Sequence, residues 1–246
     1  MTFTNSTILI TGGSSGLGLE MARRFLEMSN QVIICSRTSQ KLEDAKYKLP
    51  NVITYQCDIS KPIECKRLSE WIKEQYPQLN ILINNAAIVH QTPFFETEGI
   101  LPMLDAEVET NFLAPVRLIK LIYPILKENN KPMIINITTG LIYAPKAAYS
   151  FYNATKAALH SFTQTIRIQL KDTQTRVVEV MFPAVKTPWH KGTPPKIAIT
   201  VVKAVDEMII GLKKDKKEIR VGGSRLLYFV SRIVPEFAIK KVNNLK

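Results

Sequence analysis

The sequence is poor in cysteine and lacks the features of exported or membrane-spanning chains. Its three cysteines, Cys35, Cys57 and Cys65, cannot all pair and do not have the spacing of metal ligands, so we predict no metal site. They fall in or beside apolar stretches, which indicates buried free thiols in a reducing compartment. The first residues show neither the basic start nor the apolar run of a signal peptide, and no stretch approaches the ~20 apolar residues of a membrane span. We therefore expect a cytoplasmic protein.

Acidic residues are also scarce, with 21 Asp and Glu against 33 Lys and Arg, which leaves a net charge of +12. The excess is concentrated near the C-terminus, where a basic segment at about 224–246 mixes basic and hydrophobic residues. Such a segment can be a helix that closes the edge of a sheet, or an amphipathic helix in weak contact with an anionic membrane surface. Neither stacking aromatics nor a zinc pattern accompanies the charge, so we expect no nucleic-acid partner.

The length of 246 residues and the 46% of hydrophobic residues suit one domain with a substantial core. Apolar strand-like runs alternate with helical patterns, which is typical of parallel strands joined by crossover helices. We predict an α/β fold, a Rossmann-type doubly wound parallel sheet of about seven strands, as a single domain over 1–246 with ligands at the carboxyl ends of the strands. The predicted strands are 7–10, 32–35, 52–56, 81–84, 133–137, 177–182 and 218–221, and the predicted helices are 16–28, 40–48, 63–76, 104–127, 151–171 and 201–213.

Glycine is sparse too, with ten residues in the chain, yet four of them fall within 12–18, directly after the first predicted strand. Gly12 permits a tight turn, while Gly16 and Gly18 let a phosphate and the backbone approach closely. The N-terminus of the next helix adds N–H donors and the positive end of a dipole. This placement predicts a dinucleotide-binding turn rather than a plain one. The turn residues expected to bind the cofactor are Gly12, Ser14, Ser15, Gly16, Leu17 and Gly18.

The end of the second predicted strand lacks the Asp or Glu that usually binds the ribose hydroxyls of NAD. Ser36 and Arg37 stand there instead. A carboxylate would repel a 2′-phosphate, whereas a guanidinium can pair with it. The sequence therefore favours NADP(H) over NAD(H), the alternative being that Arg37 is merely exposed at a strand end.

Tyr152 and Lys156, four residues apart, point to redox chemistry when they accompany such a turn. Residues at this spacing are neighbours on a helix face. An ammonium ~5 Å away at an effective dielectric of ~20 would favour tyrosinate by roughly 3 kcal/mol and lower the pKa of Tyr152 by about two units. The phenol could then exchange a proton with a substrate near neutral pH. Tyr123 and Lys127 have the same spacing, but Pro124 and the apolar run around them indicate a packed helix.

These motifs together resemble those of the short-chain dehydrogenase/reductase family, single-domain type, from about Thr7 to Thr187. Asn84-Asn85-Ala86-Ala87 resembles the family's Asn-Asn-Ala-Gly, and Pro183-Ala-Val-Lys-Thr187 resembles its Pro-Gly-x-x-x-Thr, each with alanine for glycine. The resemblance implies that Asp58 meets the adenine amine, that 183–187 supports the nicotinamide, and that Lys156 holds the nicotinamide ribose. It also implies a homodimer or homotetramer. The further cofactor-binding residues expected on this basis are Asp58, Ile59, Asn85, Ala86, Ala87, Pro183, Val185 and Thr187.

Two further residues complete the expected site. Pro115 cannot donate to the carbonyl of Asn111, so this carbonyl is left free and the helix should kink there, either as a plain bend or as a functional site. The resemblance implies that the Asn111 carbonyl holds a water in a proton relay to Lys156. Thr139 stands where the family has a serine that binds the substrate carbonyl. Threonine keeps the hydroxyl and adds a methyl that restricts its rotamer.

The sequence thus predicts an NADP(H)-dependent oxidoreductase that transfers a hydride between nicotinamide and a small-molecule carbonyl or secondary alcohol. Tyr152 would be the acid/base, Thr139 the carbonyl donor, Lys156 the clamp that holds the cofactor and lowers the tyrosine pKa, and Asn111 the relay. One alternative is a catalytically weak NADP(H)-binding regulatory or scaffold protein. Another, an epimerase or dehydratase of the extended type, would need a longer C-terminal domain than the roughly 60 residues after Thr187.

Two local features bear on the substrate without identifying it. The stretch after Thr187, with Trp189 and His190, is shorter than the lid that the family often carries, which predicts an open or shallow pocket with His190 as a solvated loop residue. Ala114-Pro-Val-Arg-Leu118 and His160-Ser-Phe-Thr163 resemble a bacterial subgroup found with D-alanyl-lipoteichoic acid genes, a likeness that implies no particular substrate.

Overall fold

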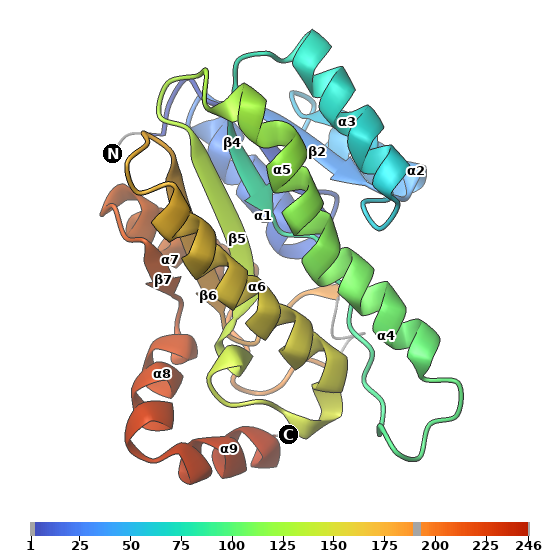
Figure 1. Cartoon of the computed structure of the whole chain (residues 1–246), viewed down its shortest axis with the longest axis vertical. Helices are drawn as coiled ribbons and strands as arrows, with labels where there is room; N and C mark the ends of the chain where they lie inside the picture. The colour runs from blue at the N-terminus through green and yellow to red at the C-terminus, as the bar shows by residue number, and fades with distance from the viewer. Residues whose placement is uncertain (1–2, 189–192, 246) are drawn as a thin grey trace.

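The computed structural model describes residues 3–188 and 193–245 (Figure 1). Trp189 and His190 lie outside the described residues. The described chain forms a seven-stranded parallel sheet in the order β3-β2-β1-β4-β5-β6-β7. The strands are β1 Thr7–Thr11, β2 Gln31–Ser36, β3 Ile53–Gln56, β4 Leu79–Asn84, β5 Met133–Thr139, β6 Arg176–Phe182 and β7 Glu218–Arg220. Each overlaps its predicted strand, so the predicted fold class is confirmed.

Helices cover both faces of the sheet, because side chains alternate along each buried strand. Ile8 and Ile10 pack in one hydrophobic cluster with helical residues of 16–27, 39–48 and 201–213, while Leu9 packs in a second cluster with helical residues of 62–75 and 114–126. The order of strands reverses between β1 and β4, and ligands of such sheets bind at this switch point. The helices on the two faces are α1 Gly16–Glu27, α2 Ser39–Lys48, α3 Pro62–Gln75, α4 Leu101–Val108, α5 Ala114–Leu126, α6 Ser150–Gln169 and α7 Val201–Lys213.

The predicted helix over 104–127 is interrupted where Asn111 and Pro115 disturb it. A π-helical turn, Glu109–Leu113, joins α4 to α5, and the Ala114 N–H donates to the Glu109 carbonyl five residues back. Because Pro115 has no N–H, the hydrogen-bond register shifts instead of simply breaking. The disturbance lies where the sequence predicts it, but its form is a π-helical turn.

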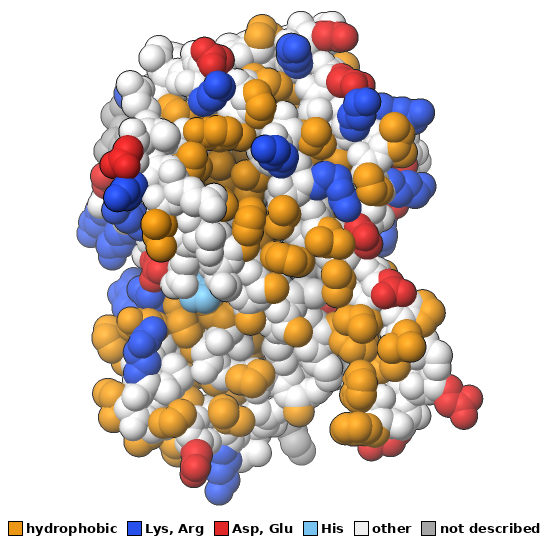
Figure 2. All heavy atoms as spheres, viewed as in Figure 1, with side chains coloured by type: hydrophobic (Ala, Val, Ile, Leu, Met, Phe, Trp, Pro, Cys, Tyr) orange, Lys and Arg blue, Asp and Glu red, His pale blue; other side chains and the backbone are white. Residues whose placement is uncertain are grey.

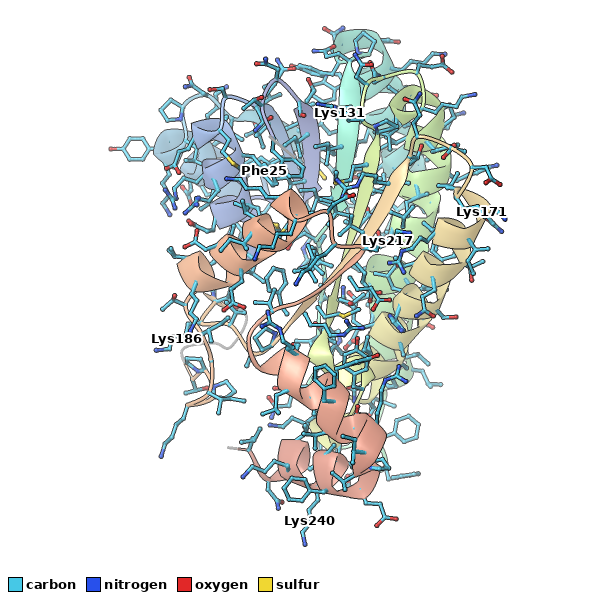
Figure 3. All side chains as sticks on the ribbon, turned by 90° about the vertical axis from the view of Figure 1, so that its left-hand side faces the viewer. Phe25, Lys131, Lys171, Lys186, Lys217 and Lys240 are labelled. Carbon is cyan, nitrogen blue, oxygen red and sulfur yellow. The ribbon has the colours of Figure 1, made fainter. Side chains whose placement is uncertain are left out.

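The basic C-terminal segment forms two helices, α8 Gly223–Ile233 and α9 Pro235–Asn244. They lie beyond the carboxyl ends of the strands, where α8 contacts the 3-10 turn Gly140–Ile142 that follows β5 (Figure 3). The segment therefore packs at the carboxyl end of the sheet, where α8 also contacts the edge strand β7. Glycine at position 140 makes the close approach possible, because a Cβ there would lie 2.6 Å from Ser224 Oγ.

Candidate active site

A cavity of about 720 Å³ lies at the carboxyl ends of the strands. It joins the glycine-rich turn at one end to α8 and α9 at the other. The C-terminal helices form one wall of it. The predicted cofactor residues that line this cavity are Gly12, Ser14, Ser15, Gly16, Leu17, Gly18, Ser36, Arg37, Asp58, Ile59, Asn85, Ala86, Ala87, Tyr152, Lys156, Pro183, Val185 and Thr187.

The glycine-rich turn has a backbone that other residues would strain. Gly12 has φ of +65° and Gly16 has φ of +53°, the left-handed region that favours glycine. A Cβ on Gly18 would lie 2.3 Å from the Gly12 carbonyl oxygen. The turn therefore forms a cradle of backbone atoms at the N-terminus of α1, which suits a diphosphate.

The end of β4 holds this cradle in place. The Asn85 side chain donates to the Thr11 carbonyl at 2.9 Å and to the Gly12 carbonyl at 3.2 Å. In return the Thr11 hydroxyl accepts the N–H groups of Asn85 and Ala86, each at 3.0 Å. These bonds fix the two neighbouring strand ends relative to each other.

The part of the cavity beyond the end of β2 is basic. Ser36 ends β2, and the exposed side chains of Arg37 and Lys41 line the cavity beyond it. Sequence reasoning missed Lys41, although its position in the first turn of the helix predicted after Arg37 was a usable signal. Asp58 accepts from the Ser60 N–H at 3.1 Å and from its hydroxyl at 2.7 Å, which orders the start of the turn that leads to α3.

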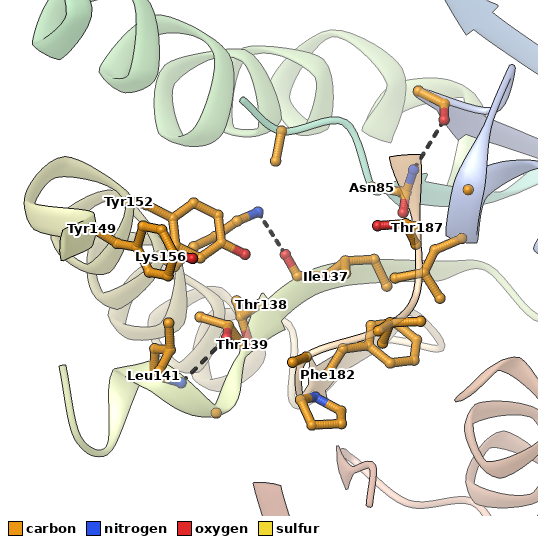
Figure 4. A pocket seen from close by; sticks show the side chains of 18 of the residues that line it. Asn85, Ile137, Thr138, Thr139, Leu141, Tyr149, Tyr152, Lys156, Phe182 and Thr187 are labelled. Carbon is orange, nitrogen blue, oxygen red and sulfur yellow. Dashed lines mark hydrogen bonds between the residues drawn. The ribbon is translucent and has the colours of Figure 1, made fainter. Parts of the chain in front are cut away.

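Three predicted catalytic side chains meet at the end of β5 (Figure 4). Tyr152 and Lys156 reach it from α6, and Thr139 is the last residue of the strand. The Thr139 side chain hydrogen-bonds to Tyr152, and its oxygen accepts the Leu141 N–H at 3.2 Å. Lys156 is buried, and its Nζ donates to the Ile137 carbonyl at 2.9 Å. Tyr123, of the second pair at this spacing, packs against a hydrophobic cluster instead.

Burial controls the protonation of these groups. It lowers the pKa of Lys156 to about 8, and Glu179 opposes this shift. Burial also raises the pKa of Tyr152, which the hydrogen bond with Thr139 partly opposes. The predicted lowering of the tyrosine pKa by Lys156 is therefore wrong for this structure. Tyr152 is a neutral phenol at neutral pH, and Lys156 is mostly an ammonium.

A buried carboxylate supports the lysine from β6. Glu179 has no exposed surface, and its oxygens accept from the Thr138 hydroxyl at 2.6 Å and lie 2.8 Å from His160 Nδ1. The negative charge of Glu179 also raises the pKa of Lys156, against the effect of burial. Sequence reasoning missed this network, although a glutamate inside the otherwise apolar stretch 177–182 is unusual for a buried strand.

Asn111 is fully buried and is absent from the described residues that line the cavity. Its Oδ1 accepts the Ile88 N–H at 2.9 Å, and its Nδ2 donates to the Ile88 carbonyl at 2.9 Å and to Thr155 Oγ1 at 3.2 Å. The side chain therefore ties the segment after β4 to α6, one residue before Lys156. Its backbone carbonyl lies in the π-helical turn.

Comparison with known proteins places this arrangement in a family. The family model for short chain dehydrogenases matches residues 6–197. The chain belongs to the short-chain dehydrogenase family. It is 43% identical over 233 residues to the uncharacterized oxidoreductase DltE of Bacillus subtilis (strain 168), which covers 92% of each chain. This relative agrees with the predicted local resemblance. Over 169 residues it is 33% identical to 11-beta-hydroxysteroid dehydrogenase 1A of Arabidopsis thaliana, a match that spans 66% of this chain and 48% of the plant protein.

Solved structures share the same fold. A short-chain dehydrogenase of Burkholderia cenocepacia J2315, in complex with NADP, has a TM-score of 0.87 at 23% identity and covers 98% of this chain and 99% of its own. A short-chain dehydrogenase/reductase of Burkholderia phymatum, in complex with NAD, has a TM-score of 0.85 at 16% identity, with 100% and 98% covered. The family match makes this chain an oxidoreductase of the short-chain dehydrogenase class, whereas the two structures differ in cofactor.

Proposed function

We propose that the protein is an NADP(H)-dependent oxidoreductase that transfers a hydride between nicotinamide and a carbonyl or secondary alcohol. The observation that carries this proposal is that Tyr152, Lys156 and Thr139 line the same cavity as the glycine cradle. The residues fit the cofactor, because the glycine-rich turn lines the cavity at the N-terminus of α1, and side chains at Gly12 and Gly18 would clash with the neighbouring protein atoms that shape this turn. When bound, the nicotinamide would accept or supply the hydride at the carbon of the substrate.

The protein's own groups would manage the proton and the developing charge. In the direction of carbonyl reduction, the neutral Tyr152 phenol would give its proton to the substrate oxygen. The Thr139 oxygen already accepts the Leu141 N–H, and its O–H, which is hydrogen-bonded to Tyr152, would turn to donate to the same substrate oxygen. Such a donor acts most strongly when the oxygen gains charge in the transition state.

Lys156 and Asn111 would support the tyrosine by stabilising its charge and returning its proton. An ammonium on Lys156 would hold the cofactor ribose and stabilise the tyrosinate that remains after proton transfer. The Asn111 backbone carbonyl would hold a water that returns a proton through Lys156. Support for this role comes from the π-helical turn, because such turns are frequent at functional sites.

A preference for NADP(H) is supported by the basic end of the cavity. Arg37 and Lys41 both line it near the position where NAD enzymes usually carry an Asp or Glu that binds the ribose hydroxyls. Thr38 is the N-cap residue of α2. Two cations and a helix N-terminus favour a 2′-phosphate.

A regulatory or scaffold role is the competing proposal, and turnover separates the two. Purified protein with NADPH is offered a panel of aldehydes and ketones, and the loss of NADPH is followed with Tyr152→Phe as the control. Turnover that depends on Tyr152 supports the oxidoreductase. NADPH binding without turnover of any carbonyl would favour the regulatory protein.

We also propose a cytoplasmic homodimer or homotetramer. The three cysteines are buried and free, which suits a reducing compartment. Hydrophobic side chains gather over the area between α5 and α6, a surface that could join copies of the chain (Figure 2). In the described part of the chain, no helix combines the length and apolar character needed to cross a membrane.

Weak contact with an anionic membrane surface would involve α8 and α9. Ile233 and Val234 are exposed between the helices, with Arg225 and Lys240 also exposed nearby in sequence. Exposed apolar side chains beside cations suit an anionic lipid surface. Sedimentation with phosphatidylglycerol vesicles, compared with neutral vesicles, tests this contact.

A further inference from the structure

The cavity wall formed by α8 and α9 is apolar and incompletely covered. Leu226 and Phe237 line the cavity, yet 68% and 58% of their surfaces are exposed. Ile197, on the segment before α7, also lines it and is 53% exposed. Large apolar side chains that stay exposed inside a pocket favour an apolar ligand, because covering their surface removes it from water and so stabilises the complex.

The two helices have a small core of their own. Ala144, Ala238 and Val242 are the fully buried members of the cluster that holds them, with Leu227 and Val230 partly buried against it. Such a small cluster leaves much of the apolar surface of α8 and α9 without a partner. An apolar group lying in the cavity would extend this cluster into a continuous core.

The wall is nevertheless held in position. The Lys146 Nζ donates to the Leu245 carbonyl at 2.8 Å, and the Ala147 N–H donates to Asn243 Oδ1 at 2.7 Å. The Asn243 side chain also donates to the Pro145 carbonyl at 3.0 Å. These bonds fasten the end of α9 to the loop between β5 and α6, beside the proposed catalytic residues. The apolar surface therefore faces the cavity in a defined place.

The two ends of the cavity differ in their charged and apolar residues. Among the described residues that line it, Asp58 is the single carboxylate, and it lies at the end of β3 beside the proposed adenosine site. The lining residues contributed by α8 and α9 are almost all apolar, with Lys241 as the exposed cation. This end suits a chain of methylene groups better than a sugar or another polyhydroxylated substrate.

We propose that the substrate is a carbonyl compound or secondary alcohol joined to an extended apolar chain, which lies along the inner faces of α8 and α9. This inference rests on the proposed oxidoreductase function and names the substrate class of the same site. The polar carbonyl would lie at Tyr152 and Thr139, and the chain would cover Leu226 and Phe237.

The test uses the full-length protein, NADPH and 2-alkanones from 2-pentanone to 2-nonanone. We expect kcat/KM to rise about fourfold for each methylene that reaches the wall, from the ~0.8 kcal/mol that burial of one methylene contributes. Leu226→Ala and Phe237→Ala should each lower kcat/KM for 2-nonanone about tenfold and leave the value for 2-pentanone nearly unchanged.

Each variant has a matched control on its own helix. Phe229 on α8 is 55% exposed and Ile239 on α9 is 44% exposed, and neither is among the described residues that line the cavity. Phe229→Ala and Ile239→Ala should therefore preserve the dependence on chain length. A flat series in the wild type, or controls as damaging as the two wall variants, would overturn the proposal.

Binding without catalysis separates this inference from the proposed function. Thermal unfolding of the Tyr152→Phe protein is measured with 2-pentanone and with 2-nonanone, in the presence of NADPH. A larger increase in Tm with 2-nonanone, lost in the Leu226→Ala background, supports the apolar wall even if no ketone is turned over. Equal shifts for both ketones, or no shift with 2-nonanone, would refute it.

Discussion

Thr138 and Thr139 are consecutive residues of β5 that both line the cavity, but their hydroxyl groups have different partners. The Thr138 hydroxyl donates to the buried Glu179 at 2.6 Å, whereas the Thr139 oxygen accepts the Leu141 N–H at 3.2 Å next to Tyr152. One threonine therefore belongs to the buried network of β6, and the other is available to a ligand in the cavity.

Thr139→Ala should lower kcat by a factor of about 100 to 1,000, because losing one donor to a developing oxyanion costs roughly 3 to 4 kcal/mol. Cofactor affinity should change much less, since the interaction forms only in the transition state. Thr139→Ser keeps the hydroxyl and should stay within about tenfold of the wild type. Steady-state kinetics and NADPH titration measure both quantities.

Thr138 is the internal control for this experiment. Thr138→Ala removes a hydrogen bond to a buried carboxylate, so its main effect should be a loss of roughly 1 to 3 kcal/mol in the free energy of unfolding. If the folded Thr138→Ala protein lost more turnover than Thr139→Ala, the assignment of the carbonyl donor would be incorrect.

Tyr152→Phe should reduce turnover at least about 100-fold, because it removes the proposed proton donor. NADPH affinity should hardly change, and Tm should fall slightly through the lost hydrogen bond with Thr139. Tyr123→Phe provides the matched control, since Tyr123 packs against a hydrophobic cluster. Greater damage to catalysis from the Tyr123 change would mean that the wrong pair has been chosen.

Arg37→Ala should weaken NADPH binding about tenfold or more and leave NADH binding nearly unchanged, because a charge-assisted hydrogen bond contributes roughly 1.5 to 3 kcal/mol. Lys41→Ala should act in the same direction but more weakly, because an ammonium is a point charge, whereas the guanidinium of Arg37 can form a bidentate pair with a phosphate. Lys46→Ala, on the same helix but outside the described cavity lining, should have no effect. Fluorescence titration with both cofactors measures this, and equal affinities for the wild type would contradict the NADP(H) assignment.

Lys156 should make stability depend on alkaline pH. Its pKa is about 8 in the folded protein and 10.5 without burial, so the unfolded chain binds more protons between these values. The contribution of this group to the free energy of unfolding therefore rises with pH across that window. Burial of the ammonium costs about 3 kcal/mol below pH 8, a cost that disappears by about pH 10.5.

The Lys156→Met protein isolates this effect, since all other titrating groups are shared with the wild type. Urea unfolding of both apoproteins at pH 7 and at pH 10.5 should show the wild type gaining about 3 kcal/mol relative to the variant. A difference between the two proteins that does not change with pH would exclude the proposed cost of burying the charge.

Local sequence patterns predict the sheet and the glycine-rich turn of the cavity well, because both depend on short-range requirements. The positive φ of Gly12 and the closeness of Gly18 to the backbone admit almost no other residue. The regular alternation of apolar runs and helical patterns leads directly to parallel strands. The ends of these strands then bring distant motifs into one place.

Long-range packing explains what the sequence could not predict. The partners of Glu179 lie 41 and 19 residues before it in the chain, at Thr138 and His160, and no local pattern links them. The amphipathic character of α8 and α9 indicates that one face is covered, but not which surface covers it. The presence of Pro115 in the sequence predicts that one helical hydrogen bond is missing. It does not predict that the helix continues through a π-helical turn, because this depends on how α4 and α5 pack.

The position of α8 and α9 has a consequence for how this enzyme can diverge. The cradle and the proposed catalytic residues lie between positions 12 and 187, whereas the apolar wall is contributed mainly by 223–245. If the proposed roles hold, the residues that carry out the reaction and those that select the substrate come from separate stretches of the chain that meet at this cavity. Exchange of 223–245 between related proteins should therefore change substrate selectivity and leave the glycine-rich turn and the proposed catalytic residues intact. This segment is therefore a suitable target for engineering selectivity.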